Sequence, residues 1–164
     1  MKNDVSITPY TPDQADALWA ILQPTFRAGD TYTIDPQISA ADAVSYWSGE
    51  GREVWMVGTE AGPLGTYYIR PNQGGGGSHV CNCGFVTHPD ARGRGIARAM
   101  LAHALGRAKE IGYRAMQFNF VIANNTRAVA TWERAGFDVV GRLPGAFNHP
   151  TDGYVDALVM YKSL

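Results

Sequence analysis

Two kinds of hydrophobic pattern alternate along the chain. In one, apolar residues recur every three or four positions, which is typical of a helix with one buried face. In the other, short runs rich in β-branched and aromatic residues lie between turn residues, which is typical of strands. The first pattern predicts helices at residues 11–29, 39–47, 95–111 and 124–136. The second predicts strands at residues 4–10, 52–60, 63–71, 78–88, 113–121, 137–143 and 153–164.

The helix expected at residues 95–111 has the clearest apolar face, which carries Ile96, Met100, Leu101, Ala104, Leu105, Ala108 and Ile111. Thr11 and Pro12 fit the start of the first helix, and Pro24 is expected to end or kink it. Residues 72–78 and 144–152 are rich in Gly, Pro and Asn and are expected to form loops. The order of elements predicts a single α/β domain over residues 1–164, with a mixed central sheet of about seven strands and about four helices.

Composition excludes several classes of function. The chain has 164 residues, 14 basic and 15 acidic, for a net charge of -1, so no nucleic-acid partner is expected. No apolar run approaches the roughly 20 residues needed to cross a bilayer, and the first residues lack a secretory pattern. We therefore expect no membrane partner and a cytoplasmic location. Cys81 and Cys83 are expected to be a buried pair on one face of a strand, with no metal bound.

The stretch "FVTHPDARGRGIARAM", residues 85–100, joins a predicted strand to a predicted helix through a glycine loop. The first N–H groups of a helix have no intrahelical partner and attract anions, while Gly93 and Gly95 leave room for phosphate oxygens. Arg92, Arg94 and Arg98 add positive charge. The loop therefore resembles a pyrophosphate cradle, although a helix with an ordinary glycine turn would show the same residues. It matches neither a Walker loop nor a dinucleotide fingerprint.

The spacing within this loop resembles the acetyl-CoA motif of the GNAT superfamily of N-acetyltransferases, Gln/Arg-x-x-Gly-x-Gly/Ala. The residues that match are Arg92, Gly95 and Ala97. A second stretch, "ANNTRAVATWERAGF", resembles the second signature of that family. Its matching residues are Asn125, Ala128, Trp132, Gly136 and Phe137. The resemblance implies the GNAT fold, with the sheet splayed between the fourth and fifth strands.

The resemblance also implies how acetyl-CoA binds. Main-chain groups around Val86 and Thr87 are expected to pair with the pantetheine arm, and an amide near Val86 to hold the thioester oxygen. The amides of the Arg92–Ala97 loop, which comprises Arg92, Gly93, Arg94, Gly95, Ile96 and Ala97, are expected to hold the pyrophosphate. Asn125 is expected to contact the pantetheine. Acetyl-CoA is thus the expected cosubstrate, and no metal is needed.

The usual acid of this family is absent at its expected position. Many members protonate the leaving thiolate with a tyrosine, and Trp132 occupies that position here. Tyr161 is an alternative acid, although a core or rim position fits it better. His88 and His149 are the titratable candidates for a base, and both fall in turn-rich segments. A thiol of pKa about 8.5 can also leave as the thiolate without an acid.

Two asparagines in apolar strands, Asn82 and Asn119, are the candidate catalytic residues. An asparagine there is costly unless its amide is paired, so each either caps a backbone break or orients an acceptor. The stretches around them resemble the GNAT branch that contains yeast L-azetidine-2-carboxylate N-acetyltransferase, which implies roles in substrate binding and catalysis. The expected activity is acetyl transfer to a small amine such as a cyclic imino acid. The alternatives are a peptide or protein N-acetyltransferase and a non-catalytic acyl-CoA-binding module. The last strand of such folds often lies at an interface, which is compatible with a homodimer.

Overall fold

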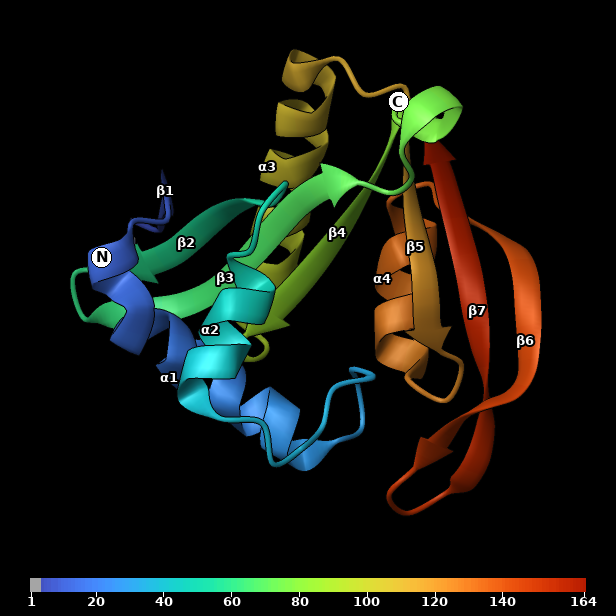
Figure 1. The fold of residues 1–164 in the computed structure, drawn as a ribbon, viewed down its shortest axis with the longest axis horizontal. Coiled ribbons are helices and arrows are strands. Elements are labelled where there is room, and N and C mark those ends of the chain that lie inside the picture. The colour runs from blue at the N-terminus through green and yellow to red at the C-terminus, as the bar shows by residue number, and fades with distance from the viewer. Residues whose placement is uncertain (1–3) are drawn as a thin grey trace.

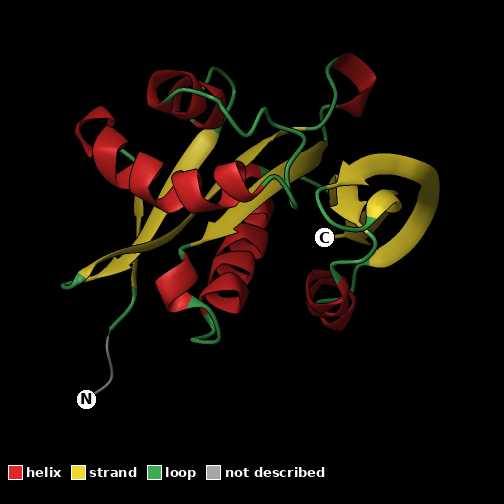
Figure 2. Cartoon of the chain, turned by 90° about the horizontal axis from the view of Figure 1, so that it is seen from below, coloured by secondary structure: helices red, strands yellow, loops and turns green. Residues whose placement is uncertain are grey.

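A seven-stranded sheet with helices on both faces forms the framework of the protein, as the computed structural model, which describes residues 4–164, shows (Figures 1 and 2). The α-helices are α1 (Ala15–Ala28), α2 (Ala40–Trp47), α3 (Ile96–Ile111) and α4 (Thr126–Arg134). The strands are β1 (Ser6–Pro9), β2 (Glu53–Thr59), β3 (Gly62–Pro71), β4 (Val80–Thr87), β5 (Ala115–Ile122), β6 (Asp138–His149) and β7 (Gly153–Ser163). No helix among the described residues is both long and apolar enough to span a bilayer.

The sheet opens between its fourth and fifth strands, as the sequence predicted. Its order is β1-β2-β3-β4-β5-β7-β6, and β4 and β5 form the parallel pair in an otherwise antiparallel sheet. These two strands pair only at Val80 with Ala115 and Cys81 with Met116. Beyond that point they diverge, which leaves one edge of each strand open (Figure 1). An open edge inside a sheet exposes main-chain donors and acceptors that a ligand can satisfy.

Two apolar layers cover opposite faces of the sheet. Side chains alternate along β3, so Tyr67 packs in the layer under α3, whereas Tyr68 packs in the layer under α1 and α2. Cys81 and Cys83 are buried free thiols in the α3 layer, which agrees with the expected pair. The layer under α3 contains buried residues of both β4 and β5, so it joins the strands on either side of the opening.

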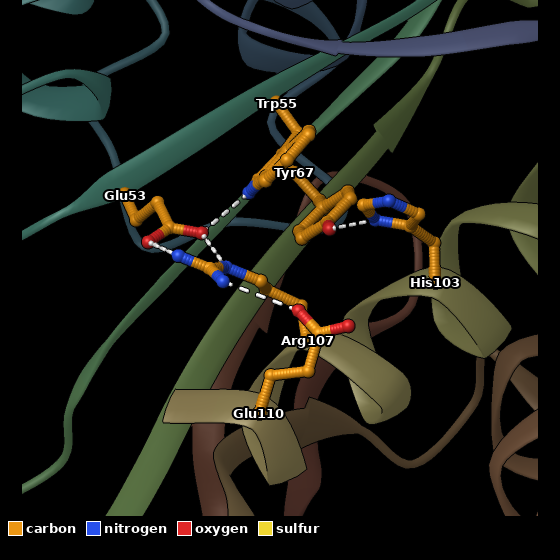
Figure 3. Close-up of polar contacts among 6 residues, drawn as sticks. All are labelled: Glu53, Trp55, Tyr67, His103, Arg107 and Glu110. Atoms are coloured by element: carbon orange, nitrogen blue, oxygen red, sulfur yellow. Dashed lines mark hydrogen bonds and ion pairs between the residues drawn. The ribbon is translucent and has the colours of Figure 1, made fainter. Parts of the chain in front are cut away.

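Polar contacts on one side of α3 fix this helix to β2 and β3 (Figure 3). Arg107 donates from Nε to Oε1 of Glu53 over 2.7 Å and from Nη2 to Oε2 over 3.0 Å, and it also pairs with Glu110. The hydroxyl of Tyr67, on β3, is hydrogen-bonded to Nδ1 of His103. These contacts hold the helix whose first turn follows the glycine loop, so they also position that loop.

The loop expected at residues 144–152 is a wrong prediction. β6 continues through this segment to His149, and β7 begins at Gly153. Two irregularities in the pairing with β7, at residues 139–141 and 143–147, absorb the extra residues as bulges. β6 is an edge strand of the sheet, so Pro144 can lie in it without removing a hydrogen bond from an inner ladder.

The ends of two predicted helices also differ from the structure. The first begins with a short 3₁₀ turn at Pro12–Gln14, where the amide of Thr11 donates to the side chain of Gln14 over 2.9 Å. Pro24 does not end α1, which continues to Ala28. Ile111, expected on the buried face of α3, is the last residue of that helix and is 42% exposed.

Candidate functional site

Two cavities meet where β4 and β5 diverge. The large cavity, about 1060 Å³, extends along the glycine loop before α3 and along α4. The small cavity, about 300 Å³, lies between β4, β5 and the segment that joins α1 to α2. The residues that line both are Thr31, Asn125, Ala128 and Trp132. The opening of the sheet therefore connects a space of cofactor size with a space for a small molecule.

The large cavity fits a pyrophosphate at the start of α3. Gly93 and Gly95 have φ angles of +76° and +78°, and a Cβ at either position would meet no atom within 4 Å. Gly95 caps α3 without any side-chain hydrogen bond, so the first amides of the helix lack a side-chain partner. Arg92 and Arg98 line this cavity, whereas Arg94, which the motif includes, does not. The first turn of α3 therefore offers free amides and positive charge to an anion.

The open edge of β4 presents the main chain of alternate residues. The amide of His88 donates to the carbonyl of Leu64 on β3 over 2.7 Å. In an antiparallel pair the direction alternates, so the main chain of Val86 also faces β3, and those of Phe85 and Thr87 face the opening. Thr87 lines the large cavity and Phe85 the small one, whereas Val86 lines neither.

Tyr32, in the segment that joins α1 to α2, occupies this open edge. Its hydroxyl donates to the carbonyl of Phe85 over 2.8 Å and accepts from the amide of Phe85 over 2.9 Å. Burial of the hydroxyl raises the pKa of Tyr32 well above its usual value, so the group is neutral at physiological pH. Sequence reasoning missed Tyr32, because a tyrosine in a helix connection carries no motif and only the fold brings it to β4.

The asparagines expected in the site are paired within the protein. Asn82 donates from Nδ2 to the carbonyl of Gln117 over 2.9 Å, one residue beyond the last pair that joins β4 to β5. Asn119 lies in the irregular part of β5, accepts from the side chain of Gln117 over 3.0 Å and donates to Oδ1 of Asn72 over 2.7 Å. Both line the small cavity. Asn82 and Asn119 therefore stabilise the point where β4 and β5 diverge, and they also border the small cavity.

Asn125 has a similar double position. Its side chain accepts from the amide of Ala128 over 3.2 Å and caps α4. It also lines both cavities. The cap places Asn125 at the junction of the cavities, and its Nδ2 group makes no hydrogen bond with residues 4–164.

The remaining wall of the small cavity is aromatic and basic. Trp132 lies against Phe85 and Phe118, with ring centroids 5.4 and 4.9 Å apart. Arg52 and Arg70 also line this cavity, and no aspartate or glutamate of residues 4–164 does. The small cavity is thus suited to a small, partly apolar molecule, and it offers no negative side chain to bind a positive group.

The titratable residues considered as acid or base lie away from this junction. Tyr161 is on β7, opposite Gln117 and Asp138, and lines neither cavity. Nδ1 of His88 accepts from the amide of Asp90 over 3.2 Å and caps a 3₁₀ turn. His149 borders the large cavity, where its Nδ1 accepts from amides of its own turn. Within residues 4–164, no three His, Cys, Asp or Glu side chains gather as a metal site would require.

Comparison with known proteins identifies the family. Residues 15–137 match the model of the acetyltransferase (GNAT) family. N-acetyltransferase aca1 of Schizosaccharomyces pombe is 39% identical over 97 residues, which are 58% of this chain and 46% of that protein. The match therefore spans less than half the length of this curated relative. Similarity to a yeast N-acetyltransferase supports the branch that the motifs indicated.

Solved structures show the same fold. A GCN5-related N-acetyltransferase from Kribbella flavida superposes with a TM-score of 0.91, is 35% identical and is covered over 98% of both chains. A phosphinothricin acetyltransferase from Sinorhizobium meliloti, solved in complex with acetyl-CoA, has a TM-score of 0.85 at 19% identity, over 98% of this chain and 88% of that one. At that identity the second likeness concerns the fold alone. The GNAT fold that the sequence predicted is confirmed.

Proposed function

The chain belongs to the acetyltransferase (GNAT) family, and from that premise we propose that it transfers the acetyl group of acetyl-CoA to the nitrogen of a small amine, such as a cyclic imino acid or an amino-acid analogue. The observation that carries this proposal is the junction of the two cavities at the opening between β4 and β5. A donor in the large cavity and an acceptor in the small one would meet there. Direct transfer needs only that the two reactants be held together in the correct orientation.

The donor is held by the first turn of α3 and by the open edge of β4. Its pyrophosphate accepts from the amides of Gly93, Gly95, Ile96 and Ala97 and lies beside Arg92. Arg94, outside the cavity, adds only long-range charge. Its pantetheine arm pairs with the main chain of Thr87 in the manner of an added strand. Because the main chain of Val86 faces β3, we place the pairing of the arm on Thr87, and Asn125 beside the arm.

The chemical step joins the acceptor nitrogen to the thioester carbon. The neutral amine attacks the carbonyl, the C–S bond breaks, the thiolate leaves with the electron pair, and the amine proton passes to water. The amide of Phe85 faces the opening and is the donor we assign to the carbonyl oxygen. The Tyr32 hydroxyl accepts a hydrogen bond from that amide, so the hydroxyl must move aside when the thioester oxygen of acetyl-CoA binds there. Asn82 and Asn119 orient the acceptor, because an amide side chain can position but cannot remove a proton.

The size and charge of the small cavity favour a small acceptor over a peptide. Its volume of about 300 Å³ is at the lower end of the range for small-molecule sites. Its wall includes Arg52 and Arg70, which favour an acceptor with a negative group beside its nitrogen, and a peptide N-terminus has no such group.

A thiol-release assay with acetyl-CoA and a panel of amines tests the proposal. The panel contains azetidine-2-carboxylate, proline, primary amino acids, polyamines and peptides, and release is expected with the small cyclic acceptors. Asn82→Ala is expected to lower kcat about tenfold or more while acetyl-CoA affinity changes less, since Asn82 lies by the acceptor cavity and not by the glycine loop. Asn148→Ala, on the edge strand β6, is the matched control. Equal losses of turnover and acetyl-CoA affinity in Asn82→Ala would leave it a purely structural residue.

A further inference from the structure

Arg52 is an arginine without an anionic partner in the wall of the small cavity. Its guanidinium lies over the ring of Tyr46, with 4.7 Å from Cζ to the centroid, and over that of Tyr68, at 4.9 Å. It forms no ion pair with any carboxylate of residues 4–164. Its Nε is shielded from solvent and has no hydrogen-bond partner among those residues. Buried donors are almost always paired, so Arg52 is an arginine whose charge and hydrogen-bonding groups the described residues leave unsatisfied.

The surroundings of Arg52 hold it in place. Gly84 lies under the ring of Tyr68, and a Cβ there would approach Cε1 of that ring to 2.5 Å, so only glycine lets Tyr68 lie against β4. Trp47 also packs against Tyr68, with ring centroids 4.7 Å apart in an edge-to-face arrangement. The aromatic side chain beneath the guanidinium is therefore fixed by packing, which orients Arg52 without neutralising it.

Arg52 stands at the end of a polar row that crosses the sheet to the opening. Glu53 pairs with Ile69, so Arg52 precedes β2 at the level of Arg70, and Arg70 pairs with Asn82 on β4. Residues opposite one another on neighbouring strands point to the same face. All three line the small cavity, and Arg70 has only a 3.3 Å contact to the carbonyl of Pro71. The row thus has two positive charges, no negative one, and an amide at the end near the junction.

We propose that Arg52 binds the carboxylate of the acceptor, so that the enzyme acetylates amines that carry a free carboxylate close to the nitrogen. This inference rests on the proposed acetyl transfer and narrows its acceptors to α-amino and imino acids. A planar guanidinium can donate two parallel hydrogen bonds to a carboxylate, and we assign this role to the Nη groups of Arg52, since Nε is shielded from solvent. In this arrangement the carboxylate of the acceptor pairs with Arg52, and the acceptor nitrogen lies toward Asn82 and the opening.

The test compares each acceptor with its carboxamide, which has the same size and no charge. Thiol release is measured for azetidine-2-carboxylate and proline against their carboxamides, with wild type, Arg52→Met and Arg52→Lys. Wild type is expected to prefer the carboxylates by about 100-fold in kcat/KM, and Arg52→Met to lose most of that preference through KM for the acceptor. Arg52→Lys keeps the positive charge but lacks the planar guanidinium, so it is expected to retain part of the preference for carboxylates. KM for acetyl-CoA is expected to stay within about twofold, because Arg52 does not line the large cavity.

Arg27→Met is the matched control, because Arg27 also stacks on an aromatic ring, that of Trp19 at 5.1 Å, and lines neither cavity. It is expected to keep the wild-type preference. Equal use of carboxylates and carboxamides by wild type would overturn the inference and leave the acetyltransferase intact, and this arm needs no folded variant. A preference retained in Arg52→Met would also overturn it.

Calorimetry separates the inference from the proposed function. Proline and prolinamide are titrated into wild type and Arg52→Met in the presence of CoA, so that no turnover is required. Binding of proline that depends on Arg52, with no acetylation of any amine, would refute the proposed transfer and support the carboxylate site. Equal binding of proline and prolinamide to wild type would refute the site.

Discussion

Replacing Tyr32 with phenylalanine tests whether acetyl-CoA displaces the Tyr32 hydroxyl from β4. The hydroxyl makes two hydrogen bonds with the main chain of Phe85, of 2.8 and 2.9 Å. Each contributes about 1 kcal/mol net, so up to about 2 kcal/mol opposes displacement in the wild type. At 1.4 kcal/mol for each factor of ten, the variant could bind acetyl-CoA up to about 30-fold more tightly. Water will take part of the hydroxyl's place at Phe85, so we expect about tenfold.

Calorimetry with acetyl-CoA and with CoA gives the decisive comparison. In the proposed arrangement only the acetyl oxygen reaches the amide of Phe85, so Tyr32→Phe should improve acetyl-CoA binding more than CoA binding. The free enzyme should also unfold at a lower temperature, because it loses both hydrogen bonds. Tyr10→Phe is the control, since the Tyr10 hydroxyl has no hydrogen-bond partner within residues 4–164 and Tyr10 lines neither cavity. Weaker or unchanged acetyl-CoA binding in Tyr32→Phe would show that the hydroxyl stays in place and would refute the assignment of Phe85.

Two further changes probe the glycine loop and the support of α3. Gly95→Glu should abolish acetyl-CoA binding in calorimetry, because it adds a negative charge at the anion site and a side chain at a φ of +78°. Gly95→Ala adds only the strained side chain and should lose less acetyl-CoA affinity. Unchanged affinity in Gly95→Glu would rule out the pyrophosphate cradle. Glu53→Gln should lower the thermal midpoint at pH 7. Arg107 holds the pKa of the Glu53 carboxyl below its usual value, so the pair stabilises the protein above the unfolded pKa of about 4.3 and stops doing so as pH falls through the folded pKa. The midpoints of wild type and variant should therefore converge near pH 3, and a constant difference would argue against the ion pair.

Local pattern predicted most of the elements and the glycine loop of the proposed donor site. The apolar spacing of α3 and the glycines before it are short-range signals, because one helix face and one turn are encoded within a few residues. Gly93, Gly95, Ile96 and Ala97 line the large cavity, where we propose that acetyl-CoA binds. The segment at residues 144–152 misled the same reasoning. Its proline and glycine usually mark a loop, but at the edge of a sheet bulges accommodate them.

The acceptor half was decided by tertiary structure. Tyr32 and Phe85 are 53 positions apart in the chain, and Asn82 reaches Gln117 over 35 positions. Neither contact leaves a periodic trace, since it depends on how helices pack on the sheet and where two strands separate. The same holds for Arg52, whose sequence neighbours describe an ordinary strand start. In the folded protein Arg52 packs on the rings of Tyr46 and Tyr68 and not against a carboxylate. Its positive charge therefore stays unpaired in the wall of the small cavity. A sequence specifies such a charge imbalance only through the whole fold, because burial and pairing are properties of the assembled neighbours.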